Sequence, residues 1–347
     1  MKGHAWPRPL LVYSAVALPI FLVTTQPVAI QIKLCFAYAV LGLFLWSVRA
    51  WLGGARAAEL RSYRGEPTAT LWLTTVGYFL LVMAVRLPIY AKTGQIWDKT
   101  PMIALVLASL FLWERLRASD FGLHARDWHR QAAVGALLFV VAWIGVALGF
   151  YVRELVVSGP PAVALGGSLD GALYNLLMFG YGNFGEELFF RGYVQTKFRR
   201  RYGVTAALFM QAALFALYHV NYRIFPRIDW PGLLLYLWFT FAFGIVVGVI
   251  AERTRGLIAP TIVHVGYNVC WPGGLFYLGF RSPETLRSAA LPWLVFLLFT
   301  VPMSLFVLDR FGYRRRAGEM GEGSHASEAG EAGAGRAAET GGEAGAS

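Results

Sequence analysis

Long apolar segments follow one another along almost the whole chain of 347 residues. A helix needs roughly 20 apolar residues to cross the hydrocarbon core of a bilayer. Segments near this length occur at roughly 10–30, 34–52, 71–91, 100–114, 131–152, 170–195, 204–220, 231–251, 257–272 and 290–308. Only 15% of the residues are charged, against about 25% in soluble domains. The sequence therefore predicts an all-α, polytopic transmembrane helix bundle of about 8–10 spans.

The net charge of +11 first suggests an acidic partner such as nucleic acid, but its distribution argues against one. The basic residues form short clusters between apolar segments, and no basic groove with interleaved aromatic residues is evident. If the N-terminus is cytoplasmic, 20 Lys and Arg side chains fall on the inner side and eight on the outer side. This bias predicts that both termini are cytoplasmic. The Ala-, Gly- and Arg-rich composition favours a bacterial inner membrane.

The composition also changes along the chain, which suggests three parts. Residues 1–116 form N-terminal transmembrane helices, and residues 117–310 form a core that carries the polar motifs. Residues 311–347 are rich in Gly, Ala and Glu, and from Ala317 onward Met320 is the only large apolar side chain. Such a segment cannot bury enough apolar surface to fold, so we expect a disordered cytoplasmic tail.

The first polar motif lies inside the apolar segment at 170–195. Glu187 and Arg191 are one helical turn apart and can form an ion pair. Glu186 is rotated about 100° away and has Phe190, not a cation, at its own next turn. The carboxylate of Glu187 is therefore neutralised by Arg191, whereas the carboxylate of Glu186 points in another direction and is left for a different partner. The alternative is an ion pair at a helix end, at the membrane surface.

Two histidine motifs follow on later apolar segments. His219 ends the segment at 204–220, four residues after Phe215, and His264 shares a helix face with Asn268. Alone, each is explained by an interfacial histidine or by a hydrogen bond between helices. Together, a carboxylate and two imidazoles can hold and deprotonate a water, and the amide of Asn268 can donate to an oxyanion.

The same donors, Glu186, His219 and His264, would also suit a four-coordinate divalent metal such as zinc, so a metal-dependent and a metal-free site both remain open. From the spacing, no further carboxylate that would orient the histidines is evident.

The three motifs, in this order, resemble those of the CAAX prenyl protease and bacteriocin-processing (CPBP) family over about residues 120 to 272. The resemblance implies an intramembrane peptidase core whose partners are membrane lipid and a peptide or protein substrate. It also implies Glu186 as general base, His219 and His264 as ligands of the water, and Asn268 as oxyanion donor. Glu187 and Arg191 would complete the first motif as a supporting pair. The spans before residue 100 have no counterpart in the family's minimal core.

Other functions compete with hydrolysis. A bacteriocin-immunity or scaffold protein would use the same polar network only to hold helices together. A transporter would use Glu and His as a proton relay, but the sequence has no paired broken helices. The substrate is not specified by the sequence, although a bacterial peptide or a sorting-tagged protein is favoured over a prenylated protein.

Overall fold

The computed structural model describes residues 60–93, 99–124, 127–157, 164–166, 169–220, 230–269, 277–279 and 286–313. The apolar segments expected at 10–30 and 34–52 lie outside these residues. So does the expected disordered tail from residue 314 onward.

The described part of the chain is built almost entirely of helices. They are α3 (Thr68–Trp72), η2 (Leu73–Gly77), α4 (Tyr78–Thr93), α5 (Lys99–Ala108), η3 (Ser109–Trp113), η4 (Ala118–Phe121), α6 (Trp128–Val157), α7 (Leu169–Glu186), η5 (Glu187–Gln195), α8 (Thr196–Tyr218), α10 (Trp230–Thr254), α11 (Ile258–Val269) and α12 (Leu286–Arg310). Each apolar segment predicted between residues 71 and 308 coincides with one of these helices or with a continuous run of them. The all-α prediction is confirmed.

Two details differ from the expectation. Two short strands, β1 (Ala164–Gly166) and β2 (Tyr277–Gly279), form an antiparallel pair. Helix α8 begins at Thr196 rather than near residue 204, and it is kinked at Gly203, whose φ of 81° suits a residue without a Cβ. Three residues per strand are too few for alternation in the sequence to reveal them.

Three helices are long and apolar enough to cross a membrane, at Trp128–Val156, Leu233–Thr254 and Leu291–Arg310. A shorter apolar helix covers Thr68–Ala84. Large apolar side chains stand exposed on the outer faces of these helices, where water would be a poor solvent for them. Examples are Leu80, Leu81, Val140, Ile144, Leu148, Leu234, Leu294, Leu298 and Phe306. These surfaces suit contact with lipid tails.

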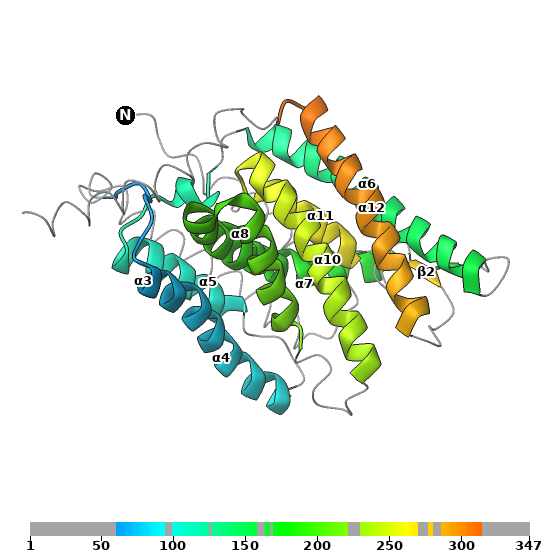
Figure 1. Cartoon of the computed structure of the whole chain (residues 1–347), viewed down its shortest axis with the longest axis horizontal. Coiled ribbons are helices and arrows are strands. Elements are labelled where there is room, and N and C mark those ends of the chain that lie inside the picture. Colours follow the sequence, from blue (N-terminus) through cyan, green and yellow to red (C-terminus); the bar gives the residue numbers. More distant parts are fainter. Residues whose placement is uncertain are drawn as a thin grey trace, which may run out of the picture.

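Figure 1 shows α12 beside α6 at one end of the bundle and α3 and α4 at the other, with α7, α8, α10 and α11 between them. The helices that carry the motifs approach closely. A Cβ added at Gly244 of α10 would lie 3.1 Å from the Cα of Ala212 on α8. Small residues at helix crossings allow such an approach within membranes. The close packing places the end of α8, and therefore His219, against the middle of the bundle.

A buried ion-pair network ties the helices before residue 117 to the later ones. Lys197 of α8, whose side chain is 0% exposed, pairs with Glu66 at 2.9 Å and with Glu114 at 2.7 Å. It also donates to the hydroxyl of Thr74 at 2.9 Å. The N-terminal helices are therefore bonded into the same core as the motifs.

Candidate active site

The end of α7 presents two adjacent carboxylates in different directions. Glu186 is the last residue of α7, and Glu187 is the first of the π-helical stretch η5. Turns with π-helical hydrogen bonds are uncommon and often occur at functional sites. Both carboxylates are buried, at 4% exposure for Glu186 and 0% for Glu187.

The expected pair between Glu187 and Arg191 is present, with 3.1 Å between Oε1 and Nη1. The same Oε1 lies 2.7 Å from Nδ1 of His264. A further carboxylate for the histidines was not evident from the sequence; that interpretation was wrong, because Glu187 fills this role for His264. The contact of Glu187 with Arg191 was predictable from their spacing of four residues. The contact of Glu187 with His264 joins helices that are far apart in the chain, so no local spacing indicates it.

The two histidines turn the same ring atom toward Glu186. Nδ1 of His219 lies 2.7 Å from the carbonyl oxygen of Phe215, which can only accept, so Nδ1 carries the proton. Nδ1 of His264 likewise donates to the carboxylate of Glu187. In each neutral ring Nε2 is then an acceptor. Nε2 of His219 lies 3.9 Å from Oε2 of Glu186, and Nε2 of His264 lies 3.8 Å from the same oxygen.

Three acceptors therefore converge with no proton between them. Among the described residues, Oε2 of Glu186 has no hydrogen-bond partner. One water that makes two hydrogen bonds of about 2.8 Å can bridge acceptors up to roughly 5.6 Å apart. Distances of 3.8 and 3.9 Å are within that reach, so one water can bridge the carboxylate to either imidazole.

Lys99 is one of the residues that sequence reasoning missed. It is among the eight Lys and Arg side chains that the charge bias places on the outer side, but it begins α5 and its ammonium group donates to Oε1 of Glu186. The same group donates to the hydroxyl of Tyr218 at 2.6 Å. As expected, Glu186 has no cation at its own next turn, and its cationic partner comes from a different helix. Because α5 and α7 are distant in sequence, no local spacing reveals this contact.

Aromatic rings line the cluster. The ring of Phe215 packs edge-to-face against His219, with centroids 4.6 Å apart, and against His264, at 5.7 Å. The guanidinium carbon of Arg191 lies 4.2 Å from the centroid of the same ring. Phe215 therefore fixes both imidazoles through its ring and orients one of them through its carbonyl group.

Asn268 is held one turn after His264 on α11, as the spacing predicted. Its Nδ2 donates to Oδ1 of Asn183 on α7 at 3.1 Å. The amide of Asn268 has a second N–H, so this bond leaves one donor for another group. Asn183 is 2% exposed and was not singled out in the sequence. Whether Asn268 contacts an oxyanion stays a prediction.

The donor geometry is a poor fit to zinc. Zinc with bonds of about 2.0–2.1 Å places tetrahedral donors roughly 3.3 Å apart. The separations of 3.8 and 3.9 Å are longer, and the Lys99 ammonium group already neutralises the carboxylate. Within the described ranges, no group of three or more His, Cys, Asp or Glu side chains has the geometry of a metal site. Metal dependence remains a prediction.

Residues 168–270 match the family described as type II CAAX prenyl endopeptidase Rce1-like. This CAAX protease segment, which is less than half of the chain, is similar to that family. All the site residues expected from the sequence lie inside the CAAX protease segment, whereas Lys99 lies outside it. No curated protein matches the chain. The family is a peptidase family, which together with the apolar helices indicates a multi-pass membrane peptidase.

Proposed function

We propose that the chain is an intramembrane endopeptidase in which Glu186 activates a water for direct attack on a peptide bond. The observation that carries this proposal is the convergence of Oε2 of Glu186 with Nε2 of His219 and of His264. These groups come from the ends or faces of three different helices, and a single water can bridge Oε2 of Glu186 to either Nε2. A buried polar cluster of this kind in membrane helices usually marks a functional site.

The proposed reaction begins when Glu186 takes a proton from the water while its oxygen attacks the carbonyl carbon of the peptide. One proton of the water points to Glu186, so the other donates to Nε2 of His219 or of His264, and this bond orients the attacking lone pair. The tetrahedral oxyanion is stabilised by donors, for which Asn268 is our candidate. The C–N bond then breaks, and the proton on Glu186 passes to the leaving nitrogen. The first products are one carboxylic acid and one amine. Transfer of the acid proton to the amine then gives a carboxylate and an ammonium group, so atoms and charge balance.

Lys99 and Glu187 have supporting parts in this proposal. Lys99 holds Oε1 of Glu186, so Oε2 is the oxygen that faces the histidines. Glu187 accepts from Nδ1 of His264 and so fixes the tautomer in which Nε2 accepts. Both are positioning residues, because they act on the reacting water through a neighbour.

For the substrate, we propose a membrane-associated peptide or protein, with a bacterial peptide or sorting-tagged protein favoured over a prenylated one. The site lies among helices with lipid-facing apolar surfaces, which suits a substrate that approaches through the membrane. We place the protein in the inner membrane with both termini in the cytoplasm, from the distribution of Lys and Arg.

The test works on the whole set of membrane peptides, so no particular substrate has to be chosen. Membranes from cells that express the wild type or Glu186→Gln are incubated in ¹⁸O-labelled water, and new peptide termini are identified by mass spectrometry. Hydrolysis places one ¹⁸O atom in each new carboxylate. We expect labelled termini with the wild type and none above background with Glu186→Gln.

Glu154→Gln is the matched control. Glu154 is also a buried carboxylate on an apolar helix, 1% exposed, but it pairs with Arg153 at 2.7 Å on α6. Its removal should leave the labelled termini in place. If Glu186→Gln produced the same labelled termini as the wild type, the peptidase proposal would fail, and an immunity or scaffold role would explain the polar network instead.

A further inference from the structure

A polar cavity lies beside the catalytic cluster, and Arg191 belongs to both. Its volume is about 340 Å³. The wall is formed by four segments that are distant in sequence, at 62–63, 119–124, 191–200 and 251–257. None of Glu186, His219 and His264 lines it. These wall segments belong to, or directly join, the parts of the chain for which the charge bias predicts a cytoplasmic location.

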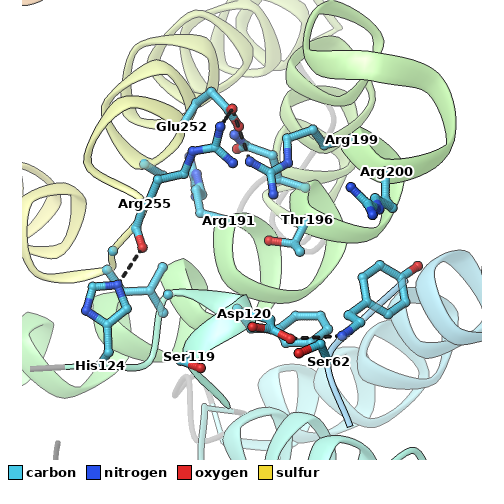
Figure 2. A pocket seen from close by; sticks show the side chains of 17 residues that line it. Ser62, Ser119, Asp120, His124, Arg191, Thr196, Arg199, Arg200, Glu252 and Arg255 are labelled. Atoms are coloured by element: carbon cyan, nitrogen blue, oxygen red, sulfur yellow. Dashed lines mark hydrogen bonds and ion pairs between the residues drawn. The ribbon is translucent and has the colours of Figure 1, made fainter. Parts of the chain in front are cut away.

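The wall is strongly basic. It includes the four guanidinium groups of Arg191, Arg199, Arg200 and Arg255, against the two carboxylates of Asp120 and Glu252. Figure 2 shows Arg199, Arg200, Arg255 and Glu252 on one side of the opening, with Ser62, Ser119 and Asp120 across from them.

The two carboxylates are already engaged within the wall. One oxygen of Glu252 serves both Arg199, at 3.2 Å, and Arg255, at 3.4 Å. Asp120 accepts from the backbone N–H of Tyr63 at 2.8 Å. Two guanidinium groups thus share one carboxylate oxygen, while the side chain of Arg200 is exposed at the rim. The wall has more positive than negative charge, so it favours an anion.

Neutral donors complete the wall. The hydroxyl groups of Ser62, Ser119 and Thr196 line the cavity together with the ring of Tyr63. Arginine forks and hydroxyl donors together match the tetrahedral oxygens of a phosphate better than a planar carboxylate alone.

We propose that this cavity binds a phosphate group, supplied either by the headgroup of an anionic lipid or by a soluble phosphate. Basic pockets between membrane helices at the cytoplasmic side bind phosphate-bearing headgroups in other proteins. A volume of about 340 Å³ is in the range of ligand pockets and leaves room for more than a bare ion. The proposal does not depend on the peptidase activity, because binding is measured directly.

Arg191 gives the cavity a physical connection to the catalytic cluster. It lines the cavity and pairs with Glu187, which in turn accepts from His264. An anion bound near Arg191 would therefore interact with the guanidinium group that pairs with Glu187. Glu187 in turn accepts the hydrogen bond from His264. Occupancy of the cavity should change the rate of hydrolysis as well as stability.

The test uses the full chain and two variants that remove the same charge at the same end of the bundle. Arg200→Gln with Arg255→Gln changes two exposed cavity residues. Arg201→Gln with Arg253→Gln is the control, because neither residue lines the cavity. Retention of phosphatidylglycerol against phosphatidylcholine is measured by native mass spectrometry. Binding of inorganic phosphate to lipid-free protein is measured by isotope-labelled equilibrium dialysis.

We expect the cavity variant to lose affinity by about tenfold or more for each guanidinium group removed, and the control to stay within about threefold of the wild type. Loss confined to phosphatidylglycerol identifies a lipid headgroup, and loss confined to inorganic phosphate identifies a soluble ligand. Equal loss in both variants, or no binding of either probe to the wild type, would overturn the proposal.

A further variant keeps every arginine in place and covers the case in which the double substitution perturbs folding. Ser62→Asp adds a carboxylate at an exposed position of the cavity wall. Repulsion by this charge should weaken phosphate binding by about tenfold, while the melting temperature without ligand stays unchanged. Wild-type affinity in a folded Ser62→Asp protein would contradict a phosphate site at this place.

Discussion

Replacement of Lys99 by Met tests whether a residue outside the CAAX protease segment positions the base. Met has similar length and no charge, so the variant removes the ammonium group that donates to Oε1 of Glu186 and to Tyr218. It leaves the apolar stem of the side chain. Glu186 would then remain as a carboxylate without its cation.

The size of the effect follows from burial. The side chains of Lys99 and Glu186 are 8% and 5% exposed, so solvent screens their interaction little. Removal of one partner from a buried ion pair costs about 3–5 kcal/mol. Some of this free energy is lost in the transition state and raises the activation barrier. At about 1.4 kcal/mol for each factor of ten, that share lowers kcat by up to roughly 10²- to 10³-fold. We expect KM to change far less, because Lys99 contacts the base and not the substrate.

The assay measures kcat and KM in liposomes with a peptide that the wild-type protein is shown to cleave, and thermal unfolding in parallel. Lys197→Met is the matched control, since Lys197 is also a buried lysine paired with carboxylates. Both variants should lose stability, but only Lys99→Met should lose kcat. Lys99→Arg keeps the charge and should recover most of kcat. If folded Lys99→Met retained kcat within about threefold of the wild type, the positioning role of Lys99 would be refuted.

Three further outcomes are expected. Arg191→Ala leaves Glu187 buried without its cation, so it should lower stability by about 3–5 kcal/mol in denaturant unfolding; a loss below about 1 kcal/mol would contradict a buried pair. Asn268→Ala should lower kcat by about 10²-fold with little change in KM, and an unchanged kcat in a folded variant would remove Asn268 from the oxyanion site. Exhaustive chelation followed by metal analysis should leave kcat unchanged; loss of activity that zinc restores would show that a metal takes part.

The sequence predicted what depends on local periodicity. The pair between Glu187 and Arg191 and the shared face of His264 and Asn268 both follow from a spacing of four residues on a helix. The positions of the helices were predicted from the positions and lengths of the apolar segments. A long apolar segment places its side chains either in the protein core or against lipid, and a helix satisfies its backbone hydrogen bonds in both places. These features do not depend on how the helices pack against one another.

Contacts between different helices could not be predicted from the sequence. Lys99 with Glu186, Glu187 with His264, and Asn183 with Asn268 each join residues that are tens of positions apart. Such pairs depend on the rotation and depth of two helices at once, and one sequence specifies neither. The direction of Glu186 was predicted, in that it points away from Arg191, but the identity of its partner was not.

Each of the two adjacent carboxylates has a cationic partner among the apolar helices. Glu186 is paired with Lys99 and Glu187 with Arg191, while the guanidinium carbon of Arg86 lies 3.6 Å from the centroid of the Tyr218 ring beside them. Cations therefore slightly outnumber carboxylates around the water position. This excess favours the ionised base and the negative charge that develops on the carbonyl oxygen during attack. A divalent cation would add two more positive charges next to Lys99, whereas a water adds none. The electrostatics of the cluster thus fit a water activated by a carboxylate, which is the outcome that the chelation experiment tests.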